Sequence, residues 1–184
     1  RGNNGELVQS ASDYPFVFSV SDELGMSSEI AGIISVDVLV LRIGDVLKMQ
    51  VPSIIFRSDK ADFVGKDVDP KKGLDQSVID NNIRVLKRIA EILNKFKDYT
   101  VRIEGHANNI SGTEAEETST ANGNIPLVPL SEERAETVRK MLIEFGVSSH
   151  RLSTVGVGGR QPVVPRGDRD NWWKNRRVEF ILNK

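Results

Sequence analysis

The sequence contains no cysteine, which excludes disulfides, thiolate metal sites and thiol nucleophiles. It also lacks a long apolar run. The longest one, residues 30–41, is interrupted by Asp37 and is shorter than the roughly 20 residues that a membrane helix needs. We therefore expect that this chain does not span a membrane. It begins with Arg1 and shows no signal peptide, which predicts that it is a piece of a longer protein.

An excess of charge of either sign is missing as well. The 184 residues include 25 Lys and Arg against 26 Asp and Glu, a net charge of −1. Without a basic field, the chain is not expected to bind nucleic acid or an anionic membrane. The hydrophobic share of 39% and the charged share of 28% are typical of a folded domain rather than of a disordered segment.

Motifs of catalysis and of cofactor binding are also absent. There is no nucleophile elbow and no candidate for a His-based triad. The segment Gly156-Val-Gly-Gly159 resembles a phosphate loop, but no helix follows it, as a dinucleotide site requires. His106 has no His/Asp/Glu cluster with metal-binding spacing, so we expect a packed, hydrogen-bonded histidine at a strand end. We predict that the chain is not an enzyme and holds no cofactor or metal.

The first 45 residues have the pattern of a small β element. Residues 14–20 are rich in β-branched and aromatic side chains, and Asp22–Gly25 supply a turn after them. Two further strand-like runs, residues 33–43 and 45–55, flank the hairpin signal Gly44-Asp45. We predict an N-terminal β segment over residues 1–45, which ends a preceding β-sandwich (Ig-like) domain, and a second domain over residues 46–184.

Helical and strand-like patterns alternate through the second domain. A helix is expected to begin at Ser77, which resembles a capping box together with Asp80, and its apolar stripe comprises Ile79, Ile83, Leu86, Ala90 and Leu93. A strand over 99–105 and a long loop without periodicity over 107–129 follow. A second helix over 131–145, with Ser131 as its N-cap and Gly146 as its stop, precedes strands over 151–157 and 177–182. This order, β-α-β-α-β-β, predicts an α/β sandwich with two helices on a mixed sheet.

Five motifs occur in a fixed order along this domain, preceded by a related segment, Phe56–Phe63. They are Ile103-Glu-Gly-His106, Leu130-Ser-Glu-Glu-Arg-Ala135, Gly146-Val147 with Arg151-Leu152, Gly156-Val-Gly158 with Pro162, and Asn175-Arg-Arg-Val-Glu179. With them, residues 46–184 resemble the OmpA-like C-terminal domains, a family that includes peptidoglycan-associated lipoproteins and flagellar motor stator subunits. The resemblance implies a non-catalytic periplasmic domain of the cell envelope, with a parent tethered at the outer membrane. It further implies binding of peptidoglycan stem peptides, chiefly through their diaminopimelate residue, which tethers an envelope protein to the cell wall.

The resemblance also implies a ligand site. Arg134, in the first turn of the second helix, is suited to bind a ligand carboxylate with two parallel hydrogen bonds. The Asp with which the family meets the ligand ammonium is replaced here by Asn108, which carries no charge. Affinity for the usual ligand should therefore fall by about 1–2 kcal/mol or more. We expect Asp59, Arg176 and Glu117, which is part of the long loop, to line the rest of the site.

The same residues leave alternatives open. In the structural alternative, Arg134 is a surface residue that pairs with Glu104 or a loop glutamate. Arg176 and Arg177 would likewise have a structural role, by pairing with Glu179 or with neighbouring strands. Two alternatives also remain for the ligand: the pocket binds a different diamino acid, such as ornithine or lysine, or it binds no ligand. In the last case the domain is a divergent OmpA-like module that has lost wall binding and acts as a structural or protein-interaction module.

Overall fold

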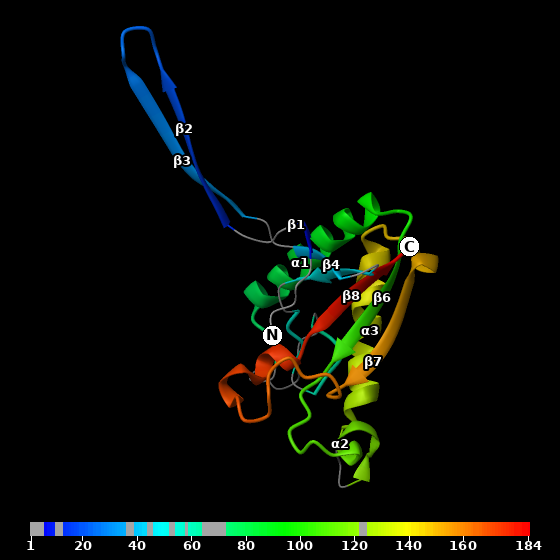
Figure 1. Ribbon diagram of the computed structural model, residues 1–184. Helices are drawn as coiled ribbons and strands as arrows, with labels where there is room; N and C mark the ends of the chain where they lie inside the picture. The colour runs from blue at the N-terminus through cyan, green and yellow to red at the C-terminus, as the bar shows by residue number, and fades with distance from the viewer. Residues whose placement is uncertain are drawn as a thin grey trace.

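A mixed sheet organises the chain (Figure 1). The computed structural model describes residues 6–9, 13–35, 39–43, 46–51, 54–57, 59–63, 73–121 and 125–184. Within these residues the sheet has six strands in the order β1-β4-β5-β8-β6-β7. Strands β6 and β7 are parallel, and every other neighbouring pair is antiparallel. The strands are β1 (Glu6–Gln9), β4 (Leu39–Ile43), β5 (Val46–Gln50), β6 (Thr100–His106), β7 (Leu152–Gly158) and β8 (Val178–Asn183).

Two long helices, α1 (Gln76–Lys95) and α3 (Leu127–Glu144), pack on one face of this sheet (Figure 1). A short helix, α2 (Glu114–Thr118), lies in the connection between β6 and α3. The 3-10 segment η3 (Ser149–Arg151) precedes β7, and the 3-10 segment η4 (Arg169–Asn175) precedes β8. This arrangement confirms the predicted OmpA-like sandwich of two helices on a mixed sheet. Among the described residues, no helix combines the length and the apolarity needed to cross a membrane.

Alternation along the strands separates an apolar face from an ionic face. Val101 and Ile103 of β6 are fully buried and pack with α1 and α3 in the core, whereas Arg102 between them is exposed. The same alternation in β8 buries Phe180 in the core and leaves Glu179 on the ionic side. Because the side-chain period of a strand is two, the apolar residues of both strands meet the helices together.

Arg151 closes the C-terminal end of α1. Its guanidinium donates hydrogen bonds to three backbone carbonyls, those of Leu93 (3.1 Å), Phe96 (2.5 Å) and Tyr99 (2.9 Å). The last carbonyls of a helix have no partner within the helix, and a cation at this end also interacts favourably with the helix dipole. A charged side chain that is 8% exposed thereby contributes to the core.

Two glycines let α3 approach the sheet closely. Gly105 of β6 and Gly156 of β7 are neighbours in the register of the parallel pair. A Cβ atom at Gly105 would overlap the backbone oxygen of Ser131, and one at Gly156 would meet the backbone of Val128 and Glu132. The first half of α3 therefore lies directly on the strand backbones, which fixes the position of the side chains that this part of the helix carries.

Three local predictions about the helices and the loop between them were wrong. Helix α3 begins at Leu127 with Pro126 as its N-cap residue, so Ser131 lies inside the helix rather than at its start. The N-cap residue of α1 is Asp75, and Asp80 accepts a hydrogen bond from Gln76 instead of closing a capping box with Ser77. The loop predicted over 107–129 contains α2 and the first residues of α3.

Strands β2 (Asp13–Ser21) and β3 (Ser27–Ser35) form a separate antiparallel hairpin that projects from the rest of the molecule (Figure 1). The side chain of Asp22 closes its turn, since Asp22 Oδ1 accepts from the N–H groups of Leu24 and Met26. Strands β1 and β4 instead extend the main sheet, so strand pairing crosses the proposed boundary between residues 45 and 46. That boundary stays a prediction. The hairpin signal Gly44-Asp45 lies outside the described residues, although Ile43 and Val46 on either side of it are paired.

Candidate functional site

Arg134 lies in the part of α3 that contacts the sheet, and its side chain is only 8% exposed. Its Nε donates to the backbone oxygen of Lys60 at 3.0 Å, and its Nη2 lies 3.5 Å from that of Arg57. The guanidinium also stands over the ring of Phe56, 5.2 Å from the centroid. Backbone carbonyls and an aromatic face therefore hold this cation. No carboxylate forms an ion pair with it among the described residues, and the alternative pairing with Glu104 is not observed.

The charges around Arg134 include two residues predicted for the site. Burial lowers the pKa of Arg134, the negative charge of Asp59 raises it, and the positive charge of Arg176 lowers it further. An arginine stays protonated under all such conditions, so these effects describe a local field rather than a titration. Asp59 and Arg176, which are far apart in the sequence, are thus brought to the same guanidinium.

Asn108 is tied to the residue that precedes Arg176. Asn175 Nδ2 donates to Asn108 Oδ1 at 2.8 Å and to the backbone oxygen of Val164 at 3.1 Å. Asn175 Oδ1 accepts from the backbone N–H groups of Val163 (2.8 Å) and Val164 (3.0 Å). Asn175 is 1% exposed and anchors the connection that follows β7. The sequence placed Asn175 in a motif, but its role as the partner of Asn108 was missed.

Glu117, predicted as a lining residue, is committed to the loop itself. It is 2% exposed, and its carboxylate accepts from the N–H of Gly159 (3.0 and 3.1 Å) and from Asn109 Nδ2 (2.6 Å). Asn109 in turn donates to the backbone oxygen of Thr113, which caps α2. These bonds fasten the loop that carries Asn108 to the end of β7. Glu117 is thus buried between the loop and the end of β7, and its carboxylate oxygens already have hydrogen-bond partners.

A second polar cluster surrounds His106 on the ionic face of the sheet. Antiparallel pairing sets Glu104 directly opposite Glu179, and His106 Nε2 lies 3.8 Å and 3.7 Å from their Oε2 atoms. The expectation that no acidic cluster accompanies His106 was therefore wrong, because Glu179 is distant in the sequence and is brought near by β8. The expected hydrogen bond is not observed either, since neither ring nitrogen has a partner among the described residues.

The electrostatics of this cluster favour a neutral histidine. Burial, chiefly, and the positive charges of Arg177 and Lys48 lower the pKa of His106 to about 4, while Glu179 alone raises it. One ligand atom from each of Glu104, His106 and Glu179 lies within 4.8 Å of the others, a spacing that a metal ion could use. The two carboxylates are, however, already paired with three cations: Lys48, Arg102 and Arg177, at 2.6–2.7 Å. We therefore assign this cluster to the structure of the sheet, with Arg177 paired to Glu179 as the structural alternative predicted.

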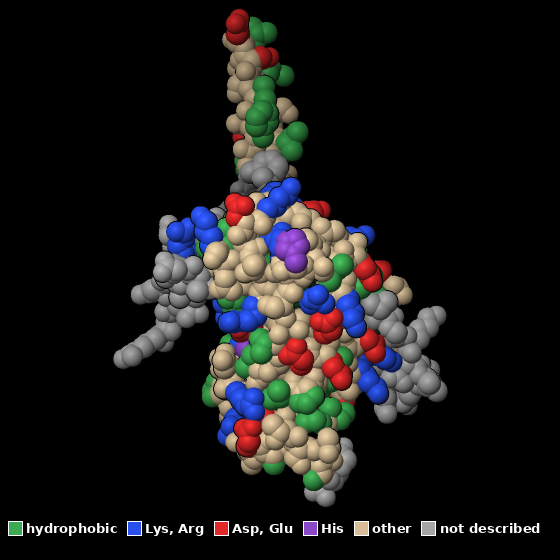
Figure 2. All heavy atoms as spheres, turned by 90° about the vertical axis from the view of Figure 1, so that its right-hand side faces the viewer, with side chains coloured by type: hydrophobic (Ala, Val, Ile, Leu, Met, Phe, Trp, Pro, Cys, Tyr) green, Lys and Arg blue, Asp and Glu red, His purple; other side chains and the backbone are tan. Residues whose placement is uncertain are grey.

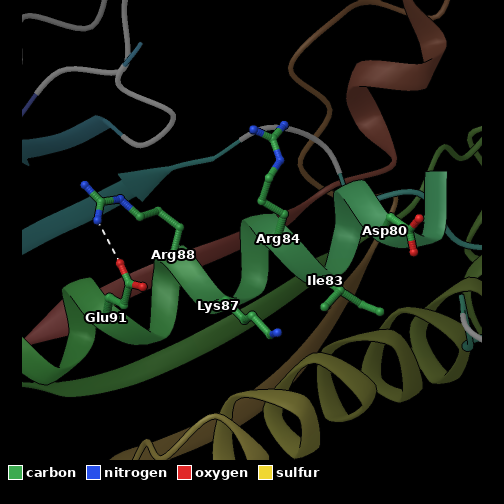
Figure 3. A pocket seen from close by; sticks show the side chains of 6 residues that line it. All are labelled: Asp80, Ile83, Arg84, Lys87, Arg88 and Glu91. Carbon is green, nitrogen blue, oxygen red and sulfur yellow. Dashed lines mark hydrogen bonds and ion pairs between the residues drawn. The ribbon is translucent and has the colours of Figure 1, made fainter. Parts of the chain in front are cut away.

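A shallow hollow on the outer surface of α1 lies apart from these residues (Figure 3). Its side chains are mostly charged and belong to one helix face, and Arg88 Nη1 is bound to Glu91 Oε2 at 2.7 Å. The lining residues are Asp80, Ile83, Arg84, Lys87, Arg88 and Glu91. This composition is that of a solvated helix face, so the hollow is not a candidate ligand site.

Residues 74–176 match the OmpA family. The chain belongs to this family. Among its curated relatives, the peptidoglycan-binding protein ArfA of Mycobacterium tuberculosis is 32% identical over 107 residues, which are 58% of this chain and 29% of ArfA. The peptidoglycan-associated lipoprotein of Mesorhizobium japonicum is 36% identical over 98 residues, which are 53% of this chain and 52% of the lipoprotein. The chain thus spans about a third to a half of the length of these relatives.

Solved structures support the same fold. The periplasmic domain of Helicobacter pylori MotB superposes with a TM-score of 0.58 at 21% identity, covering 90% of this chain and 87% of that domain. The OmpA-like domain of FopA1 from Francisella tularensis gives a TM-score of 0.53 at 17% identity, covering 79% of each chain. At these identities the likeness concerns the architecture: helices on a mixed sheet, as the periodicities predicted.

Proposed function

We propose that this OmpA-family chain is a non-catalytic periplasmic domain that binds a peptidoglycan stem peptide and tethers an envelope protein to the cell wall. The observation that carries the proposal is the state of Arg134. A guanidinium that is 8% exposed, held by carbonyls and without an ion-pair partner among the described residues, is costly to bury. A ligand carboxylate would offset that cost. The relatives named for peptidoglycan, ArfA and the associated lipoprotein, favour a stem peptide as its source.

The proposed site assigns a part to each predicted residue. Arg134 binds the carboxylate, and Asp59 and Arg176 set the charge beside it. Asn108 contacts the neighbouring group of the same ligand, and Glu117 acts from beneath by fastening the loop of Asn108 to Gly159. None of these parts requires a nucleophile or a bound metal.

Co-sedimentation with purified sacculi tests the proposal. We expect the native chain to pellet with sacculi, and Arg134→Ala to weaken binding by about 1.5–3 kcal/mol, roughly 10- to 150-fold. Arg88→Ala, a change of the same kind on the exposed face of α1, is the matched control. Because Arg134 also packs on Phe56, Arg134→Lys is the second variant: it keeps the charge and loses the planar fork. A native chain that stays in the supernatant contradicts wall binding.

A second candidate function, a divergent module for protein interaction, is favoured by the hairpin of β2 and β3. Figure 2 shows hydrophobic side chains on this projection. Phe18, Val20 and Ile30 are 55–67% exposed, and Phe18 and Ile30 face each other across the two strands. An isolated two-stranded hairpin is marginally stable in water. We propose that the β2–β3 hairpin of the predicted N-terminal segment, residues 1–45, completes a β sandwich outside the wall-binding unit, whereas β1 and β4 of that segment belong to the main sheet.

Thermal unfolding and binding of a fluorescent apolar dye test this assignment. Replacing Phe18 and Ile30 by serine should leave the unfolding temperature of the OmpA domain unchanged, because both side chains are exposed. The same double variant should lose much of the dye binding of the native chain. A clear drop in unfolding temperature would instead show that the hairpin packs on the domain.

A further inference from the structure

The orientation of the Asn108 side chain is fixed by its surroundings. Asn175 Oδ1 accepts from the two backbone N–H groups of Val163 and Val164, which can only donate. The amide of Asn175 therefore cannot be turned around, and its Nδ2 must face Asn108. Since Nδ2 is a donor, Asn108 presents its oxygen to Asn175. The oxygen of Asn108 is thus bonded inside the protein.

The other end of the Asn108 amide has no partner. Its Nδ2 atom is buried, and no acceptor bonds to it among the described residues. A buried donor without an acceptor costs about 1–3 kcal/mol, and such groups in native proteins call for an explanation. Position 108 therefore offers a hydrogen-bond donor, where an aspartate would offer an acceptor with a negative charge. An acceptor on a ligand must enter past the side chains that now cover this atom.

The charges nearby act in the same direction. Arg176 directly follows Asn175, the partner of Asn108, and its positive charge lowers the pKa of Arg134, so these two cations lie near each other. An ammonium group would meet the donor of Asn108 and the repulsion of these two arginines, which the negative charge of Asp59 opposes. A neutral or anionic oxygen would meet neither obstacle.

We propose that Asn108 makes this site selective for a stem peptide whose diamino-acid amine is acylated, as it is in a cross-link, over the peptide with a free ammonium. Acylation removes the positive charge and adds a carbonyl group to the former ammonium nitrogen, and the oxygen of that carbonyl accepts from Asn108 Nδ2. The carboxylate of the same residue binds Arg134. This inference rests on the proposed function and specifies its ligand.

Calorimetry with two soluble peptides tests it: a diaminopimelate tripeptide with a free side-chain amine, and the same peptide with that amine acetylated. We expect the native chain to bind the acetylated peptide about 10-fold more tightly, and Asn108→Asp to reverse this order. Asn94→Asp, the same change on α1, is the matched control and should keep the native order. A native chain that binds the free amine equally or more tightly overturns the inference and leaves the proposed function standing.

A second variant leaves Asn108 in place. Asn175→Asp keeps an acceptor for Val163 and Val164 and presents an oxygen to Asn108, so the Asn108 amide should turn around and direct its own oxygen to the site. It also loses the bond to the Val164 oxygen, so its fold is checked first by thermal unfolding. We expect preference to shift toward the free amine; equal loss for both peptides would show a merely structural role. Failure of the native chain to bind sacculi and both peptides refutes the proposed function itself, together with this inference.

Discussion

Replacing His106 by glutamine should reduce the decrease in the free energy of unfolding that this domain shows in acid. In the folded chain the imidazole is 1% exposed, and burial is the largest cause that lowers its pKa to about 4 from an ordinary value of 6.5. Between these two pH values the unfolded chain binds a proton at His106 that the folded chain excludes. The free energy of unfolding therefore rises with pH through this window and falls as the solution is acidified from pH 6.5 to pH 4.

The size of the effect follows from the same shift. One pKa unit corresponds to about 1.4 kcal/mol, so the shift of His106 sets an upper bound of about 3 kcal/mol. The charged partners around it are partly solvated, and screening reduces this figure, so we expect about 2 kcal/mol. Glu179 acts in a lower pH window. Burial raises the pKa of Glu179, but hydrogen bonds from Lys48 and Arg177 outweigh burial and lower this pKa. The contribution of Glu179 to stability is therefore lost as the pH falls below 4.5, the ordinary pKa of a glutamate.

Urea unfolding between pH 7 and pH 4.5 measures the difference. The native chain should lose stability steadily over this range, and His106→Gln should lose about 2 kcal/mol less, because glutamine does not titrate. His150→Gln is the matched control, since His150 is the other histidine of the chain and is exposed. If the free energy of unfolding falls equally with pH in the native chain and in His106→Gln, the reasoning is refuted, and other groups cause the acid sensitivity.

Three further predictions concern residues that hold the helices and the loop in place. Gly105→Ala should lower the free energy of unfolding by more than about 2 kcal/mol, because its Cβ would overlap the backbone of α3, whereas Gly167→Ala, with open space around it, should change nothing; equal urea midpoints would contradict this. Arg151→Lys should cost about 2 kcal/mol in the same assay, since an ammonium cannot reach the three carbonyls that the guanidinium binds; native stability in this variant would refute the capping role. Glu117→Gln, which removes the charge, should speed amide hydrogen exchange at Gly159, and an unchanged exchange rate would speak against the fastening role of this carboxylate.

The start of α3 shows where sequence reasoning falls short. A serine followed by two glutamates is typical of a helix start, so the helix was predicted from Ser131. The helix instead begins at Leu127 and contains Pro129 in its first turn, where a missing N–H breaks no helical bond. Ser131 is buried and binds the oxygen of Val128 and the N–H of Gly158. By contrast, four of the five residues predicted for the apolar stripe of α1 are buried, because periodicity averages over many residues; these four are Ile79, Leu86, Ala90 and Leu93.

The sequence by itself determined the fold and supplied the candidate site residues. Two periodicities and five ordered motifs were enough for the sandwich, since each element must bury its own apolar face. Only the tertiary structure decided which contacts those residues make. Strand pairing brings Glu179 opposite Glu104 beside His106, and the loop turns Glu117 inward to Gly159. It also decided which end of the Asn108 amide is free, because that depends on two backbone N–H groups, those of Val163 and Val164, far away in the sequence.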